Sequence, residues 1–163
     1  AASDVYKRQA HHNAVFIGTD EGGCPRHAHL RSTNSFGKAF RLNVESSDPR
    51  YSFHHTGADG SLYVFEAPID LMSYCTLHRG FHSNALALCC LDDRALSVFL
   101  REHPAVRKVV LCLDHDRPGQ EAAERMGRKY AAEGYAVQTL SPPSRKDWNA
   151  YLTFVQQFRE RGR

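Results

Sequence analysis

Short apolar runs alternate with helix-like segments through the second half of the chain, and this rhythm limits the fold more than any other feature. The segments between the runs carry apolar residues at helical spacing, with proline, aspartate or glycine at their ends. Such alternation predicts a parallel sheet with right-handed crossovers and flanking helices. The runs are LYVFE (62–66), NALALCC (84–90), KVVLCL (108–113) and YAVQTL (135–140).

The expected helices begin at residues that favour a first helical turn. Proline is favoured there, so Pro68 begins one helix, whose buried side we expect to include Ile69, Met72, Leu77 and residues between them. Another helix is expected to open at Pro118 and Gly119 and to end at Gly134.

Residues 13–58 have a different character. Their apolar runs are shorter and partly alternating, and the turn signals EGG and SSDP separate them. The sequence GADG at 57–60 then marks a boundary. We therefore expect a β-rich region over residues 13–58 and an α/β domain over residues 59–163.

The first residues, AASDVYKRQ, resemble a translated sequencing adaptor and show no periodicity. On that interpretation residues 1–12 lie outside the fold and the chain is an N-terminally truncated part of a longer protein. A short natural disordered terminus is the alternative interpretation.

The stretch VVLCLDHDRPG (109–119) ends an apolar run in two aspartates, Asp114 and Asp116. Like charges at the end of a buried strand are unfavourable unless a proton or a metal ion offsets them. Glu66 ends the first apolar run in the same way, and Asp70 follows it by one helical turn. Parallel strands share one carboxyl edge, so neighbouring strands would place Glu66 about 5 Å from the aspartates.

An all-oxygen ligand set favours Mg²⁺ or Mn²⁺, whose usual chemistry in proteins is phosphoryl or nucleotidyl transfer. A D-x-D pair alone is also compatible with a solvated strand end that holds nothing. The glutamate at the matching edge of another strand favours the metal site.

Bulk properties exclude few classes. The net charge of +3 and the pI near 8.7 are compatible with nucleic-acid binding without singling it out. The apolar runs are too short to span a membrane. The five cysteines are odd in number and form no C-x-x-C pair, which indicates reduced thiols and a cytoplasmic location.

Cys24, His27 and His29 form a C-x-x-H-x-H pattern that offers zinc ligands. The sequence shows no fourth ligand, and alternate residues of a strand often carry surface histidines. We therefore favour a surface position for both histidines.

The segments LYVFEAPIDLMSY and VVLCLDHDRPGQEAA resemble the Toprim domain, which bacterial replicative primases, topoisomerases and several nucleases share. The family pattern is a strand ending in glutamate, an aspartate four residues later, and a later strand ending in D-x-D. The segment RKDWNAYL (145–152) is similar to the acidic segment after the fourth strand of primase-type Toprim domains. The β-rich half resembles the region that precedes Toprim in primase-like proteins of bacterial plasmids and conjugative elements.

The resemblance covers nearly everything after residue 13, and it implies a Toprim-type, Rossmann-like parallel sheet flanked by helices, with a β-rich N-terminal extension. It also implies an Mg²⁺ or Mn²⁺ cofactor and roles for seven residues. The expected catalytic residues and metal ligands are Glu66, Asp114 and Asp116, the supporting metal-side acids are Asp70 and Asp147, and the substrate-binding residues are Lys146 and Asn149.

The chain departs from the family where primases commonly have glycine, at Ala67, at His115 and at the Cys89-Cys90 pair. These departures bear on the shape of the loops rather than on the acids.

The implied function is that of a bacterial primase-like enzyme acting in DNA replication of a mobile element. Its partners would be nucleic acid, nucleotides and other replication or conjugation proteins, with no membrane. We expect this chain to bind Mg²⁺ and catalysis to require the full-length parent protein.

Three alternatives stay open: a Toprim-type nuclease, a non-catalytic nucleic-acid-binding module, and a phosphatase of the haloacid dehalogenase type. The last requires threonine or valine shortly after the acidic pair, where this chain has Pro118 and Gly119, and it leaves Glu66 without a role.

Overall fold

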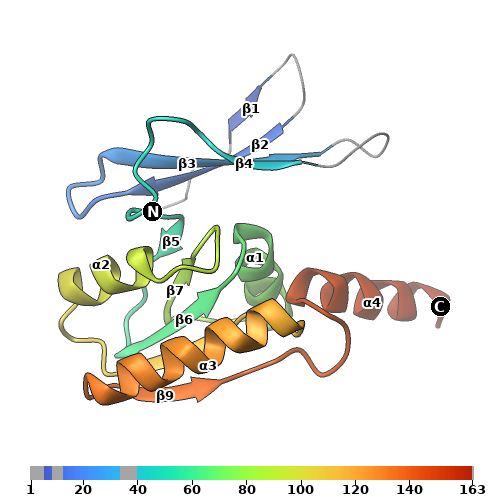
Figure 1. The fold of residues 1–163 in the computed structure, drawn as a ribbon. Helices are drawn as coiled ribbons and strands as arrows, with labels where there is room; N and C mark the ends of the chain where they lie inside the picture. Colours follow the sequence, from blue (N-terminus) through green and yellow to red (C-terminus); the bar gives the residue numbers. More distant parts are fainter. Residues whose placement is uncertain (1–5, 9–12, 34–39, 163) are drawn as a thin grey trace.

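The computed structural model describes residues 6–8, 13–33 and 40–162. They form two layers, an antiparallel sheet lying above a mixed α/β domain (Figure 1). The upper sheet has the strand order β1-β2-β3-β4, and the lower sheet has the order β5-β7-β6-β8-β9. Among the residues that the structure describes, no helix is long and apolar enough to cross a membrane.

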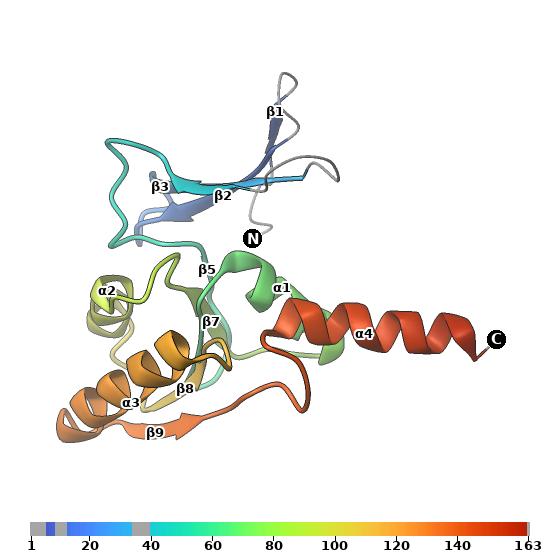
Figure 2. The same ribbon diagram turned by 45° about the vertical axis from the view of Figure 1, so that its right-hand side comes forward.

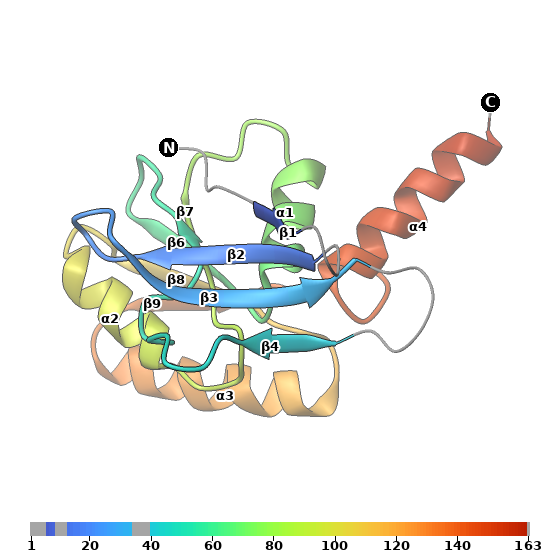
Figure 3. The ribbon, with the colours of Figure 1, turned by 90° about the horizontal axis from the view of Figure 1, so that it is seen from above.

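The upper sheet is a meander of antiparallel strands, seen face-on in Figure 3. Its inner face packs on the α/β domain through Phe16, whose ring meets Phe53 edge-on at 5.4 Å. Its outer face leaves Leu42 57% exposed. The strands are β1 (Tyr6–Arg8), β2 (Asn13–Thr19), β3 (Pro25–Ser32) and β4 (Arg41–Asn43).

Two expectations about this region need correction. Tyr6–Arg8 pair with β2, so part of the segment that we placed outside the fold is a strand. His27 and His29 lie on the inner face of β3 and are buried, because the upper sheet covers the α/β domain rather than facing solvent on both sides.

The lower sheet confirms the α/β prediction. All four expected runs form strands, and the pairs β6–β7, β6–β8 and β8–β9 are parallel. β5 joins the same sheet, antiparallel to β7, although its residues fall within the region that we expected to be separate. The strands are β5 (His54–His55), β6 (Ser61–Phe65), β7 (Asn84–Ala87), β8 (Lys108–Cys112) and β9 (Ala136–Thr139).

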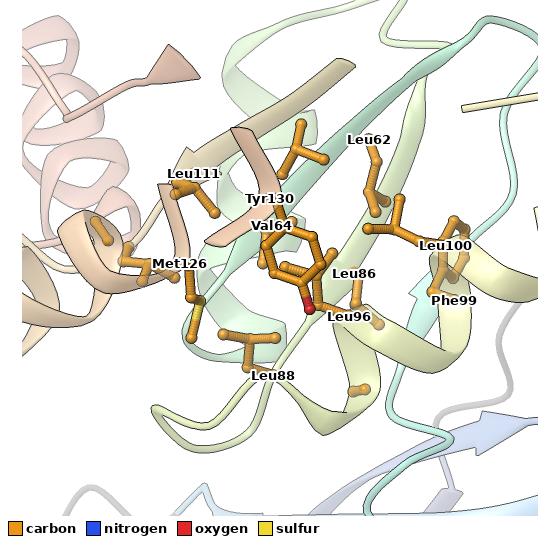
Figure 4. Packing of buried hydrophobic residues seen from close by; sticks show 14 of the residues in the cluster. Leu62, Val64, Leu86, Leu88, Leu96, Phe99, Leu100, Leu111, Met126 and Tyr130 are labelled. Carbon is orange, nitrogen blue, oxygen red and sulfur yellow. The ribbon is translucent and has the colours of Figure 1, made fainter. Parts of the chain in front are cut away.

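Helices cover both faces of this sheet. α2 and α3 bury one face, where alternate strand residues such as Val64 and Leu111 meet Leu96 and Met126 (Figure 4). α1 and the start of α4 bury the other face, and the rest of α4 projects away from the domain (Figure 2). The helices are α1 (Pro68–Leu77), α2 (Arg94–Glu102), α3 (Arg117–Ala132) and α4 (Trp148–Arg161).

α1 buries residues within the expected span, and Met72 is the exception. Leu71 and Tyr74 are buried, whereas Met72 is 37% exposed. α1 is apolar on several sides, so its hydrophobic pattern does not fix which side faces the sheet. The aromatic cluster of Tyr74, Phe65 and Trp148 determines that orientation.

Candidate functional site

The acidic residues meet at the carboxyl edge of the lower sheet. β6 and β8 are adjacent and parallel, with Phe65 opposite Cys112, so Glu66 and Asp114 follow neighbouring strand ends. The adjacency that the metal hypothesis required is therefore present. Glycine at position 119 allows α3 to begin against this edge, because an added Cβ there would lie 2.2 Å from the carbonyl oxygen of Asp114.

Glu66 is half-buried and electrostatically linked to the aspartates. Burial raises the pKa of its carboxyl group, and the negative charges of Asp114 and Asp116 raise it further. Arg41 opposes this shift from the upper sheet, with its Nη1 atom 3.8 Å from Oε1 of Glu66. Glu66 therefore holds its proton more tightly than an exposed glutamate does.

Asp114 and Asp116 converge on a single cation. The Nζ atom of Lys146 lies 3.3 Å from Oδ2 of Asp114 and 3.0 Å from Oδ2 of Asp116. Burial raises the pKa of Asp114 although Lys146 opposes the shift. The pKa of Asp116 is lowered, because its carboxylate accepts the backbone N–H of Gly119 at 3.0 Å and contacts Lys146.

The two supporting acids hold α4 in place. Asp70 is 5% exposed, and its Oδ1 atom accepts the backbone N–H of Asn149 at 3.0 Å. Asp147 is the N-cap of α4 and accepts the N–H of Ala150 at 2.7 Å. Burial raises the pKa of Asp70 to about 7, and the charges of Asp147 and Asp114 add to the shift.

Lys146 and Asn149, the residues expected to bind substrate, have different surroundings. Lys146 lies at the acidic edge. The side-chain oxygen of Asn149 accepts a hydrogen bond from the hydroxyl of Ser73 at 3.3 Å, which ties α4 to α1. Substrate binding by Asn149 stays a prediction, and its contacts in this structure are with the protein.

Two arginines that sequence analysis did not single out face the same edge from the upper sheet. Arg31 and Arg41 are opposite one another in the β3–β4 register. Arg41 acts on Glu66 and Asp116, and Arg31 acts on Asp70. The alternation in β3 and β4 indicates which strand face each arginine shares. It does not indicate that this face lies over the acidic edge.

The carboxylates fit a hard divalent cation by their chemistry and by their common edge. Among the described residues, however, no three histidine, cysteine, aspartate or glutamate side chains are arranged to hold a metal ion. At the acidic edge the ammonium of Lys146 lies between the two D-x-D carboxylates. A metal ion would therefore enter by replacing this ammonium.

Cys24, His27 and His29 do not converge. Cys24 is exposed at the turn between β2 and β3, where its backbone N–H binds Asp20. His29 shares a hydrogen bond of 2.7 Å with Asn43, and both ring nitrogens of His27 are buried without a hydrogen-bond partner.

Cys89 explains one departure from the family pattern. Its φ angle is +59°, in the left-handed region that favours glycine. The loop after β7 therefore keeps a glycine-like conformation, and the N–H of Cys89 donates to the carbonyl of Glu66 at 2.9 Å. This cysteine helps to fix the strand end that carries the glutamate.

The larger of two cavities lies away from the acidic edge. It has a volume of about 640 Å³ and lies between the β2–β3 turn and α2, lined by Asp20, His54, Phe99 and His103 among others. None of the five acids lines it. A smaller cavity of about 230 Å³ adjoins the acidic edge and includes Asp114, Gly119 and Ser141.

Comparison with known families agrees with this arrangement. The family described as Toprim-like matches residues 63–152, and a family described as a protein of unknown function (DUF3991) matches residues 1–59. The chain belongs to the Toprim-like family, and the resemblance to primase-like Toprim proteins is confirmed. An uncharacterized protein of Mycoplasma pneumoniae, the MG010 homolog, is 32% identical over 95 residues, which is 56% of this chain and 42% of that protein.

Solved structures share the fold at low identity. The primase fragment of the bacteriophage T7 primase-helicase protein matches with a TM-score of 0.66 and 16% identity, over 96% of this chain and 63% of that chain. A DNA primase domain from Pseudomonas aeruginosa matches with a TM-score of 0.61 and 15% identity, over 96% of this chain and 55% of that chain. The chain thus spans about half to two thirds of the length of these structures, and less than half of its mycoplasma relative.

Proposed function

We propose that this chain is the metal-binding part of a primase-like protein and supports Mg²⁺-dependent nucleotidyl transfer on nucleic acid. The observation that carries the proposal is the coupling of Glu66, Asp114 and Asp116 at one sheet edge. Arg31 and Arg41 face this edge from the other sheet. Carboxylates that suit Mg²⁺ and arginines that suit phosphate are the two groups that such chemistry requires.

Glu66, Asp114 and Asp116 would hold Mg²⁺, which when bound stabilises negative charge on phosphate oxygens. Asp70 and Asp147 would support the site through their hold on the start of α4. Glu66 would also take part in general acid/base transfer, because its carboxyl group lies at the same sheet edge as the two aspartates.

Arg31 and Arg41 would contact substrate phosphates. A guanidinium group donates in a planar fork that matches phosphate oxygens. The Arg41 side chain is well exposed, and its 3.8 Å contact with Glu66 is long for an ion pair. It is therefore able to exchange the carboxylate for a phosphate at little cost.

The partners would be nucleic acid and nucleotides, with other replication or conjugation proteins assembled around the full-length protein. The similar structures from bacteriophage T7 and Pseudomonas aeruginosa are primases. In a further similar structure, of the bacteriophage T7 lagging-strand DNA polymerase, the primase domains are bound to an RNA/DNA hybrid and dTTP. This supports a primase-like role, and we propose in addition that the protein serves a bacterial mobile element in the cytoplasm.

The test is a synthesis assay on the full-length protein that contains this chain, with single-stranded DNA, ribonucleotides and Mg²⁺. We expect template-dependent oligonucleotides. Replacing both D-x-D acids, Asp114→Asn with Asp116→Asn, should reduce their formation by about 100-fold or more. The matched control is Asp92→Asn with Asp93→Asn, an aspartate pair at the start of α2 that should leave synthesis unchanged. Metal-dependent cleavage without synthesis would instead identify a nuclease, and binding without either reaction would identify a non-catalytic module.

A further inference from the structure

Lys146 occupies the point at which the D-x-D carboxylates converge. Its ammonium contacts Oδ2 of Asp114 and Oδ2 of Asp116, at 3.3 and 3.0 Å. The contact offsets the repulsion between two like charges at a strand end. The lysine side chain remains 55% exposed, so it is free to leave this position toward solvent.

The backbone around Lys146 is fixed on both sides. Arg145 has a φ angle of +83°, a left-handed conformation that is unfavourable for a residue other than glycine. Its guanidinium lies 4.0 Å from the ring centre of Phe154 on α4, which helps to hold this conformation. On the other side Asp147 caps α4.

A third contact ties this backbone directly to the acidic strand end. The N–H of His115 donates to the carbonyl of Lys146 at 2.6 Å, between the two aspartates in sequence. The base of the lysine side chain is therefore held beside the D-x-D pair while its ammonium can move. In an ordinary surface ion pair nothing else fixes the side chain near its partner, whereas here backbone contacts hold Lys146 beside the two aspartates.

An ammonium and a divalent ion cannot share this position. Mg²⁺ binds carboxylate oxygens at about 2.1 Å and would lie within a few ångströms of the Nζ atom, where like charges repel. Metal binding must therefore displace the ammonium from both carboxylates. Because the base of the side chain stays anchored, the displaced ammonium remains close to the metal and to any phosphate that the metal holds.

We propose that Lys146 is a built-in counter-ion of the metal site. It holds the D-x-D pair in the metal-free protein, competes with the divalent ion, and moves to a substrate phosphate once the metal is bound. This inference rests on the proposed metal site. It adds that the metal ion and phosphate favour each other's binding. The metal ion pairs with the carboxylates that the ammonium has left, and the phosphate pairs with the displaced ammonium.

The first test measures Mn²⁺ affinity by isothermal titration calorimetry. Lys146→Met removes the competing charge and keeps much of the side-chain bulk. Each part-exposed ion pair is worth up to about fivefold in an equilibrium constant, so loss of both should tighten Mn²⁺ binding by about 2- to 30-fold. The matched control is Lys129→Met, because Lys129 also pairs with an aspartate, Asp93, at 2.6 Å. Its Mn²⁺ affinity should equal that of the wild type.

The second test uses the wild-type protein and does not depend on whether a variant folds. In wild-type protein labelled at lysine ¹³Cε and ¹⁵Nζ, Mg²⁺ addition should shift the Lys146 side-chain signals and leave those of Lys129 in place. Inorganic phosphate added to the Mg²⁺-loaded protein should shift the Lys146 signals again.

The outcomes separate the inference from the metal site. Tighter Mn²⁺ binding by Lys146→Met, with a Mg²⁺-dependent shift of the Lys146 signals, would support the counter-ion role. Wild-type protein that binds Mn²⁺, together with a variant that binds it equally or more weakly, would overturn the inference and leave the metal site intact. Absence of Mn²⁺ binding in both proteins would overturn the metal site itself. If Lys146→Met does not fold, Lys146→Gln and the wild-type spectra supply the same comparison.

Discussion

Asp70 should make the metal-free protein less stable as the pH rises toward neutrality. Its carboxyl group is buried, and its pKa is raised to about 7 by burial, with added repulsion from Asp147 and Asp114. In an unfolded chain an aspartate has a pKa of about 3.9. The folded protein therefore retains a proton that the unfolded chain has lost, between about pH 4 and pH 7.

This difference in pKa sets the direction and the size of the change in stability with pH. Stability that comes from the protonated carboxyl group is fully present below about pH 4, is lost as the pH rises to about 7, and changes no further above that. Three pKa units at about 1.4 kcal/mol each give a loss of about 4 kcal/mol. Asp70→Asn keeps an oxygen that accepts the N–H of Asn149 and removes the charge. The variant should exceed the wild type in free energy of unfolding by about 4 kcal/mol at pH 8 and by nearly nothing at pH 4.

Urea denaturation of both proteins from pH 4 to pH 8, with EDTA present, measures this difference directly. Asp48→Asn is the control of opposite sign, because its hydrogen bonds to Arg50 lower the pKa of Asp48 and stabilise the ionised form. A difference between wild type and Asp70→Asn that does not change with pH, or that grows toward acid, would refute the argument.

Packing predictions can be checked by the same unfolding assay. Gly119→Ala should destabilise the protein by about 1–3 kcal/mol or more, because its Cβ would lie 2.2 Å from the carbonyl oxygen of Asp114. Gly127→Ala, in the same helix, has no atom closer than 4.0 Å and should stabilise by about 0.5–1 kcal/mol; a loss of similar size at both glycines would contradict this account. Leu96→Ala, in the core beneath α2, should cost about 2–5 kcal/mol, whereas Leu42→Ala on the exposed sheet face should change stability by less than about 0.5 kcal/mol.

The parallel sheet could be predicted because local signals suffice for it. Each apolar run has strand length, and proline, aspartate or glycine ends each intervening helix. The adjacency of β6 and β8 was a condition of the metal hypothesis and not a prediction, because local signals do not fix the order of parallel strands. β5 extends the lower sheet although its residues lie in the region expected to be separate, because two residues, His54 and His55, carry too little pattern to show which sheet they join.

The acids of the candidate site could be found from the sequence, but their surroundings could not. The arginines opposite them depend on the register of β3 and β4 and on how one sheet lies over the other. The position of Lys146 depends on the left-handed backbone at Arg145, which no residue preference indicates. The burial of His27 likewise depends on the sheet above the domain, since alternation alone does not say which face is covered.

The central claim is that the carboxyl edge of the lower sheet binds a divalent ion, and thermal unfolding with and without Mg²⁺ tests it most directly. A ligand that binds only the folded protein stabilises it by about 2.7 kcal/mol at one hundred times its Kd. The wild type and the control variant with Asp92→Asn and Asp93→Asn should both show a Tm that rises with Mg²⁺ concentration. The variant with Asp114→Asn and Asp116→Asn should show no rise. An equal Mg²⁺-dependent rise in Tm for all three proteins would contradict the assignment of the metal to Glu66, Asp114 and Asp116.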